Sequence, residues 1–160
     1  MMIDRLKTTP LPIQLPIGKE ENFQGIIDLI AMKAILYDPL SLGTKYEAVD
    51  IPEAYQKEAS ISRDYLIEKL AERNDFLMEK FIDGQEISEL ELRRTLREVT
   101  LQLKGTPVLC GAAFRNKGVQ PLLDAIIDYL PSPLDIPPVK GVNLQGQSLT
   151  FSANNGHPLS

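Results

Sequence analysis

The chain has 160 residues, 43% of them hydrophobic and 24% charged, which suits a soluble globular protein of one domain or one and a half. Its 22 acidic and 17 basic residues give a net charge of −5, which is poorly suited to broad contact with a phosphate backbone, so we expect no DNA partner. The single Cys110 excludes an internal disulfide, and the single His157 argues against a metal site or a histidine-based catalytic triad.

The first 50 residues predict the end of a helix and then a small sheet. Residues 1–7 have the pattern of a last helical turn, which Thr8-Thr9-Pro10 ends. Apolar and alternating runs then predict three or four strands, the first of which has prolines that confine it to an edge or to strand ends. The expected strands cover residues 11–17, 23–30, 32–37 and 45–50.

The middle of the chain predicts helices. Pro52 suits a first helical turn, and apolar or small residues recur after it with helical spacing. Asn74 marks a break or a new start. Ser88 and Glu91 form the pattern of a capping box, in which each side chain meets the other residue's backbone N–H. The helix that they open is expected to run to about Leu103, and Gly105 can end it with positive φ.

Residues 106–110 predict a buried strand with Cys110 as a buried thiol, followed by a tight Gly/Ala turn and an amphipathic helix. We expect Ile126 and Ile127 to pack on that strand. The apolar stripe of the helix comprises Val119, Leu122, Leu123, Ile126, Ile127 and Leu130. Such a layout can put backbone N–H groups at the carboxyl end of a strand, where open α/β sheets bind ligands.

The last 30 residues predict no core of their own. Residues 131–138 contain four prolines, which stop the helix and predict a stiff, extended linker. The polar residues from Gly141 onward predict the start of a following domain or a disordered tail.

Three long runs carry a family resemblance. They are Pro12-Ile-Gln-Leu-Pro-Ile-Gly18, Asn116-Lys-Gly-Val-Gln-Pro-Leu-Leu-Asp124 and Asp128-Tyr-Leu-Pro-Ser-Pro133. With shorter matches between them, they cover nearly the whole chain and resemble the translational GTPases, elongation factor G in particular. A related release-factor GTPase or ribosome-protection protein stays open as an alternative, as does a stand-alone protein-interaction module with no nucleotide history.

The resemblance implies an α/β fold in four parts. Residues 1–10 would be the remnant of a GTPase-domain helix, and 11–105 an α+β insert, usually called G-prime, with a small, mainly antiparallel sheet and helices. Residues 106–130 would be the terminal strand–helix unit of a P-loop GTPase domain. Residues 131–160 would be a proline-rich linker and the truncated start of the next domain.

A phosphate-binding loop is missing from this sequence. No Gly-x-x-x-x-Gly-Lys-Ser/Thr pattern occurs in the 160 residues. The resemblance implies that GTP and Mg²⁺ are bound by the full-length parent. We expect the chain by itself to hold no cofactor, to carry no catalytic residue and not to hydrolyse GTP.

The turn after the 106–110 strand matches the family's guanine-contacting Ser-Ala element. The resemblance implies guanine contact by Ala112, Ala113 and Phe114, with the N–H that follows Ala112 donating to the guanine carbonyl oxygen. Ala112 stands where the family has Ser, so a hydroxyl is lost while the backbone contact is kept. The residues alone also allow a plain strand-to-helix turn, and they allow Asn116-Lys-Gly118 to be a polar loop or a weak anion site.

Four acidic residues recur at i, i+4, i+8 and i+11 along the first long helix, and together we call them the acidic row: Asp64, Glu68, Glu72 and Asp75. Their pattern alone is typical of a solvated face. In the resembling family, acidic residues of this insert helix meet a basic helix of the ribosomal stalk protein. The resemblance therefore implies ribosome and stalk binding by electrostatic steering.

The remaining expectations concern location and assembly. No signal pattern opens the chain, and no apolar run approaches ~18 residues. We therefore expect a cytoplasmic monomer with no membrane contact.

Overall fold

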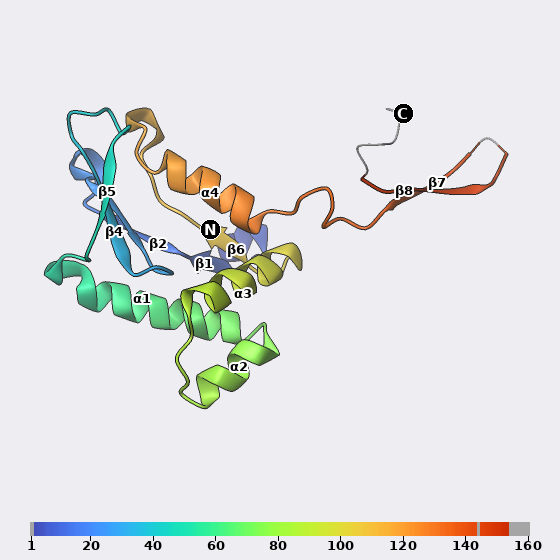
Figure 1. The fold of residues 1–160 in the computed structure, drawn as a ribbon, viewed down its shortest axis with the longest axis horizontal. Helices are drawn as coiled ribbons and strands as arrows, with labels where there is room; N and C mark the ends of the chain where they lie inside the picture. Colours follow the sequence, from blue (N-terminus) through green and yellow to red (C-terminus); the bar gives the residue numbers. More distant parts are fainter. Residues whose placement is uncertain (1, 144, 154–160) are drawn as a thin grey trace. The chain divides into compact units, whose positions relative to one another are not determined.

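A computed structural model describes residues 2–143 and 145–153, and the chain divides into two units, Met1–Tyr129 and Leu130–Ser160 (Figure 1). The first unit holds all the helices α1 to α4 and the strands β1 to β6. The second unit holds the strands β7 and β8. Strands and helices mix throughout the first unit, and its larger sheet is small and antiparallel, so the predicted α/β class is confirmed.

The elements of the first unit follow the predicted order. The strands are β1 (Pro10–Pro12), β2 (Gln14–Ile17), β3 (Gly25–Asp28), β4 (Lys33–Tyr37), β5 (Tyr46–Val49) and β6 (Thr106–Val108). The helices are α1 (Glu53–Ala71), α2 (Asp75–Ile82), α3 (Glu89–Leu101) and α4 (Val119–Tyr129). Short helical turns cover Met2–Leu6, Glu20–Asn22 and Ala113–Arg115.

The strands β2, β3, β4 and β5 form an antiparallel meander in that order. Ile27 on β3 pairs with Leu15 on β2 and with Ala34 on β4, which fixes the register of the buried face. The Asp28 carboxylate accepts the backbone N–H groups of Ile30 and Ala31, at 2.7 and 3.0 Å, and so stabilises the turn between β3 and β4. The expected sheet of three or four strands is confirmed.

The strand expected over residues 11–17 is wrong as a single element. β1 pairs in parallel with β6, whereas β2 belongs to the antiparallel sheet. The chain changes sheets at Ile13, whose N–H donates to the Val108 carbonyl at 3.0 Å. Pro10, Pro12 and Pro107 all lie in the two-stranded pair, where missing N–H donors break no wider ladder.

Helix caps agree with the sequence. The Asn74 side chain accepts from the Leu77 N–H at 2.9 Å and begins α2. Ser88 and Glu91 form the predicted capping box of α3. The expected role of Gly105 is wrong, because α3 already ends at Leu101 and positive φ falls on Leu103, at 57°. Gly105 is instead a close-packing position, since a Cβ there would lie 2.5 Å from Leu11 Cδ1.

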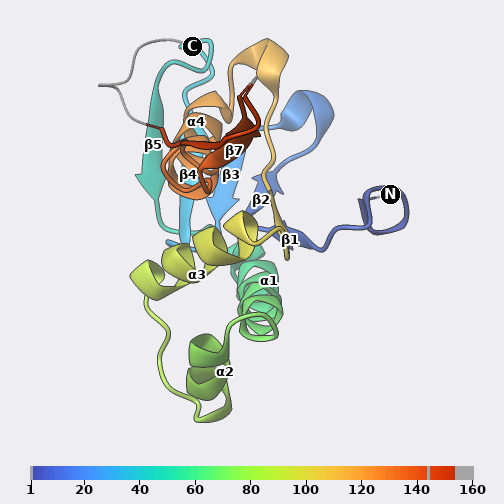
Figure 2. The same ribbon diagram turned by 90° about the vertical axis from the view of Figure 1, so that its right-hand side faces the viewer.

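One core unites the sheet and the helices of the first unit (Figure 2). It includes the fully buried Leu11 of β1, Ile27 of β3, Leu66 of α1 and Leu96 of α3. The Arg63 side chain of α1 also donates to the carbonyls of the β3–β4 turn, so α1 is fixed to the end of the sheet.

Two burial expectations for the 106–130 segment are wrong. Thr106 is exposed and residues 107–110 are only partly buried, so the strand is not a core strand. On α4, Ala125 and Tyr129 are the buried residues, whereas Ile126 and Ile127 are 44% and 75% exposed. The physical reason is that β6 has one neighbour, β1, and the described residues provide no wider sheet for the apolar stripe to cover.

The second unit contains more local structure than the sequence suggested. Strands β7 (Val139–Val142) and β8 (Ser148–Phe151) form an antiparallel hairpin, so the alternative of a disordered tail is wrong for these residues. The alternative that this segment begins a following domain stays a prediction. The proline-rich segment is not a fully extended linker either, because Ser132 and Asp135 hydrogen-bond to each other and form a turn. The final residues 154–160, including His157, lie outside the described residues.

Candidate functional site

Residues 111–118, hereafter the 111–118 loop, connect β6 to α4 through a closed neck. Ala112 and Lys117 exchange backbone hydrogen bonds of 2.9 and 3.2 Å. Asn116 has φ of 53°, a left-handed conformation that Asn tolerates better than most residues. Gly118 has φ of 86°, and a Cβ there would lie 2.9 Å from the Cys110 carbonyl oxygen, so glycine is required by both conformation and space.

The predicted guanine-contacting residues lie together at the tip of this loop. Ala112 is half-buried, whereas Ala113 and Phe114 are exposed. Within the described part of the chain, the Ala113 N–H has no acceptor, so it is available to a ligand. This is the N–H that follows Ala112, and its availability is compatible with the expected contact to a carbonyl oxygen.

A shallow cavity of about 210 Å³ adjoins the loop. Apolar atoms of Leu109, Val119 and Leu122 contribute to its lining, together with Cys110. Burial raises the pKa of the Cys110 thiol to about 11. The thiol is therefore protonated at neutral pH and is a poor nucleophile.

The polar residues of the loop do not form an anion site. Lys117 Nζ donates to the Phe23 carbonyl at 2.9 Å, and Arg115 Nη1 donates to the Glu21 carbonyl at 2.7 Å. Sequence reasoning missed that these side chains hold the loop against the antiparallel sheet region. The available signal was the run of three polar residues at 115–117, but spacing in the sequence did not reveal their distant partners.

The acidic row is exposed but does not lie on one helix, which corrects the sequence expectation. Asp64 and Glu68 are on α1, Glu72 is the residue that caps its C-terminal end, and Asp75 begins α2. The reason is the extended conformation of Asn74, with φ of −144°, which ends the first helix and redirects the chain. The acidic row therefore extends from the C-terminal half of α1, through the connection, to the first residue of α2.

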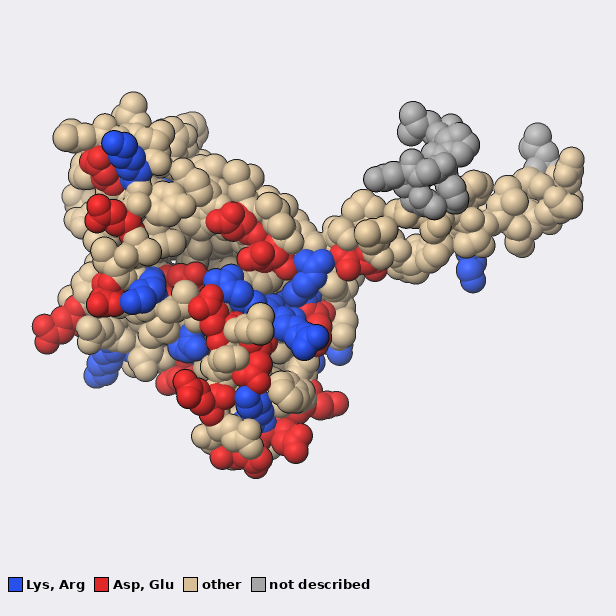
Figure 3. Space-filling view, in the orientation of Figure 1, with Lys and Arg blue, Asp and Glu red and all other residues tan. Residues whose placement is uncertain are grey.

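The basic side chains at the corner between α1 and α2 are hydrogen-bonded and partly buried, whereas several carboxylates are exposed to solvent. Arg73 donates to the Lys69 and Lys104 carbonyls and to Thr9 Oγ1, and Lys80 pairs with Glu91 at 2.6 Å. The side chains of Lys69, Arg73 and Lys80 are only 22%, 19% and 20% exposed, compared with 54% for Glu68. Figure 3 shows Asp and Glu side chains gathered over α2 at this end of the unit.

Glu72 is the most strongly paired member of the acidic row. It contacts Lys69 and lies 2.9 Å from Arg73 Nη1. Hydrogen bonds from these two cations hold the pKa of the Glu72 carboxyl below its usual range. Part of its charge is therefore compensated locally, whereas Asp64 and Asp75 make no ion pair within the described residues.

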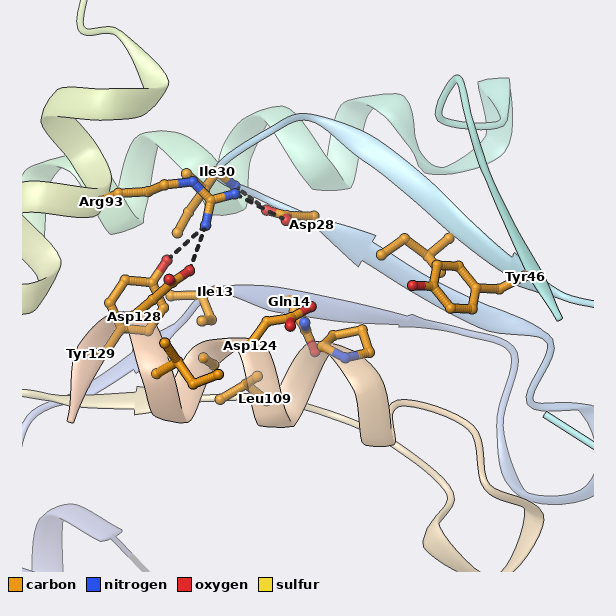
Figure 4. A pocket seen from close by; sticks show the side chains of 14 residues that line it. Ile13, Gln14, Asp28, Ile30, Tyr46, Arg93, Leu109, Asp124, Asp128 and Tyr129 are labelled. Atoms are coloured by element: carbon orange, nitrogen blue, oxygen red, sulfur yellow. Dashed lines mark hydrogen bonds and ion pairs between the residues drawn. The ribbon is translucent and has the colours of Figure 1, made fainter. Parts of the chain in front are cut away.

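A second cavity, of about 370 Å³, lies between α3, α4 and the antiparallel sheet (Figure 4). At its edge, Arg93 of α3 contacts Asp128 and the Tyr129 hydroxyl of α4, at 3.4 and 3.1 Å, and lies 3.9 Å from Asp28 of β3. Arg93 therefore joins three elements, α3, α4 and β3, through the carboxylates of Asp28 and Asp128 and the Tyr129 hydroxyl. We assign it a structural role.

The described residues supply no metal site or membrane span. Residues 2–143 and 145–153 contain no group of three His, Cys, Asp or Glu side chains placed to hold a metal ion. No helix in the same ranges combines the length and apolar character needed to cross a membrane.

The chain is an α/β protein that combines an antiparallel sheet and its helices with a strand–loop–helix unit. The loop of that unit is a candidate binding loop, because it lies at the carboxyl end of a strand. The fold is similar to a crystal structure of a protein from Thermus thermophilus, with a TM-score of 0.71 and 28% identity over 88% of this chain and 21% of the other. No family model matches the chain.

Curated relatives give the particular family. The chain is 55% identical to elongation factor G of Thermotoga maritima over 88% of its length and 20% of the relative. It is 49% identical to elongation factor G of Thermotoga neapolitana over 94% of its length and 21% of the relative. The chain therefore belongs to the elongation factor G family and spans about a fifth of the length of the curated relatives that it matches.

Proposed function

We propose that this chain acts as part of a translation elongation factor of the G type, a GTPase that promotes movement of the ribosome along messenger RNA. Its region of residues 11–105, hereafter the insert, would dock on the ribosomal stalk protein. The 111–118 loop would supply one contact to guanine. This role implies action in the cytoplasm, as a monomer, in contact with the ribosome.

The observation that carries the docking proposal is the asymmetry of charge at the corner of α1 and α2. Asp64 and Asp75 of the acidic row face solvent and make no ion pair within the described residues. The neighbouring cations are held by carbonyls, by a hydroxyl and by the carboxylates of Glu68, Glu72 and Glu91. A basic helix approaching this corner meets exposed carboxylates, of which Asp64 and Asp75 are unpaired within the described residues. The attraction speeds encounter and weakens as salt rises. The chain matches proteins named elongation factor G, and the resemblance drawn from the sequence implies the stalk protein as the source of that helix.

The nucleotide proposal is narrower. The available Ala113 N–H supports a single contact to the base, and the tight turn at Gly118 keeps the loop close to where α4 begins. Triphosphate and Mg²⁺ need a phosphate-binding loop, which this sequence lacks. GTP and Mg²⁺ would therefore be held by the whole factor, with this loop as one side of the guanine pocket.

Equilibrium binding of the chain to purified stalk protein tests the docking proposal. We expect binding at low salt that weakens by about tenfold or more when Glu68, Glu72 and Asp75 are all replaced by Lys. A matched variant that reverses three exposed carboxylates elsewhere, Glu21, Glu47 and Glu58, should bind like wild type. Equal loss in both variants, or no binding by the wild-type chain with intact circular dichroism, would favour the alternative of an interaction module for another partner.

A further inference from the structure

The 111–118 loop and the start of α4 are joined to the insert by five hydrogen bonds between residues 74 to 94 positions apart. The bonds run from Arg115 Nη1 to the Glu21 carbonyl (2.7 Å), from Asn116 Nδ2 to the Leu42 carbonyl (3.3 Å), from Lys117 Nζ to the Phe23 carbonyl (2.9 Å), from the Gly118 N–H to the Tyr37 hydroxyl (2.8 Å) and from Gln120 Nε2 to the Gly43 carbonyl (3.2 Å).

All five acceptors lie at one end of the antiparallel sheet. Glu21 and Phe23 belong to the connection between β2 and β3, whereas Leu42 and Gly43 belong to the connection between β4 and β5. Both ribbon views place the 111–118 loop beside these two connections (Figures 1 and 2). The approach is close, because a Cβ on Gly43 would lie 2.6 Å from the carbonyl oxygens of both Arg115 and Asn116.

One of the five bonds is accepted by a buried hydroxyl, and another is donated by a partly buried ammonium group. Tyr37 is 4% exposed and Gly118 is buried, so loss of the hydroxyl would leave a buried N–H without an acceptor. Lys117 is partly buried and donates from a charged ammonium, which makes its hydrogen bond stronger than one between neutral groups. By comparison, the strand that leads into the loop is held weakly, since β6 pairs over three residues with β1 alone.

We propose that Tyr37 and Lys117 are positioning residues for guanine, which hold the 111–118 loop so that the Ala113 N–H stands ready for the base. This inference rests on the proposed function, because it requires that the loop contact guanine in the whole factor. A loop that is ordered in advance loses less conformational entropy when the nucleotide binds. Loosening the loop therefore speeds nucleotide release, while phosphoryl transfer at the distant phosphates keeps its rate.

The test uses the whole elongation factor that contains this chain. In it, Lys117→Met keeps the aliphatic stem and removes the donor, Arg115→Met does the same for the exposed neighbour, and Tyr37→Phe removes the buried acceptor. Lys19→Met is the matched control, because Lys19 lies beside the same turn and its side chain makes no hydrogen bond within the described residues. The readouts are the release rate of fluorescent GDP, KM and kcat for GTP, and the melting temperature.

We expect Lys117→Met and Tyr37→Phe to release GDP roughly three- to tenfold faster, the size expected for a lost hydrogen bond that orders a loop. KM for GTP should rise by a similar factor while kcat stays at the wild-type value. A purely structural role would instead lower the melting temperature and kcat together. Arg115→Met removes another of the five hydrogen bonds at an exposed position, so it should also speed GDP release without a buried substitution.

Each outcome decides the inference. Wild-type release rates in folded Lys117→Met and Tyr37→Phe would overturn it and leave the proposed function intact. An equal increase in the GDP release rate in Lys19→Met would also overturn it, because the effect would then not depend on the hydrogen bonds of Tyr37 and Lys117. Absence of guanine nucleotide binding by the wild-type factor would overturn the proposed function and this inference with it.

Discussion

Individual aliphatic side chains differ in burial in a way that helical spacing alone did not reveal. Leu66 of α1 has no exposed surface and lies in the core, whereas Ile126 of α4 is 44% exposed. Both occupy regular apolar stripes in the sequence. The difference arises because α1 packs against three elements, β1, α2 and α3, whereas α4 packs mainly against α3 within the described residues.

Truncation of these two side chains tests their assignment. Leu66→Ala should cost about 2–5 kcal/mol, since it leaves a cavity in a closed core. Ile126→Ala should cost about 1 kcal/mol or less, because nearly half of the side chain is already in water. Urea unfolding of the two variants gives both values. A loss above about 2 kcal/mol for Ile126→Ala would mean that the helix stripe is buried as the sequence predicted.

At the scale of elements, short-range signals in the sequence predicted structure well. Asn74 and the pair Ser88 and Glu91 begin α2 and α3 as expected, because capping depends on residues three positions apart. These signals are local hydrogen bonds, which the sequence encodes directly.

Contacts between distant residues were not predictable in the same way. The division of residues 11–17 between two sheets depends on pairing with β6, nearly 100 positions later. The exposure of residues 106–110 depends on how many strands flank them, and the hairpin of β7 and β8 pairs short runs that carry little apolar signal. At the candidate site, the loop itself was predicted from its motif, whereas the hydrogen bonds of Tyr37 and Lys117 that hold it were not.

The capping box of α3 should make stability depend on acidity. Hydrogen bonds from Lys80, and then from Ser88, hold the pKa of the Glu91 carboxyl at about 2. A carboxyl with a lowered pKa in the folded state stabilises the fold above its ordinary pKa of 4.5, and this contribution is lost as pH falls toward 2. Glu91→Gln should therefore unfold at lower urea than wild type at pH 7, with a difference that shrinks between pH 4.5 and pH 2.

The control for this measurement is Glu86→Gln, which removes an exposed carboxylate just before the helix. Its urea midpoint should follow that of wild type across the same pH series. A constant difference between Glu91→Gln and wild type from pH 7 to pH 2 would show that the ionised carboxylate of Glu91 does not stabilise α3.

At the scale of the whole molecule, the first unit carries two candidate surfaces on one core. The acidic row lies at the corner of α1 and α2, and the 111–118 loop is held by the connections at one end of the antiparallel sheet. Between them, Arg63 fixes α1 to the β3–β4 turn, and Arg93 joins α3 to α4 and faces β3. A substitution at either surface can therefore be made without altering the fully buried core.

The most direct measurement of the proposed role is stopped-flow association of the whole factor with ribosomes that carry the stalk and with ribosomes stripped of it. We predict that replacing Glu68, Glu72 and Asp75 together by Lys slows association with intact ribosomes, more at low salt than at high salt. Stripped ribosomes should not distinguish the variant from wild type, and the melting temperatures should agree. Equal association rates for variant and wild type on intact ribosomes at low salt would contradict the account and leave the acidic row as a solvated face.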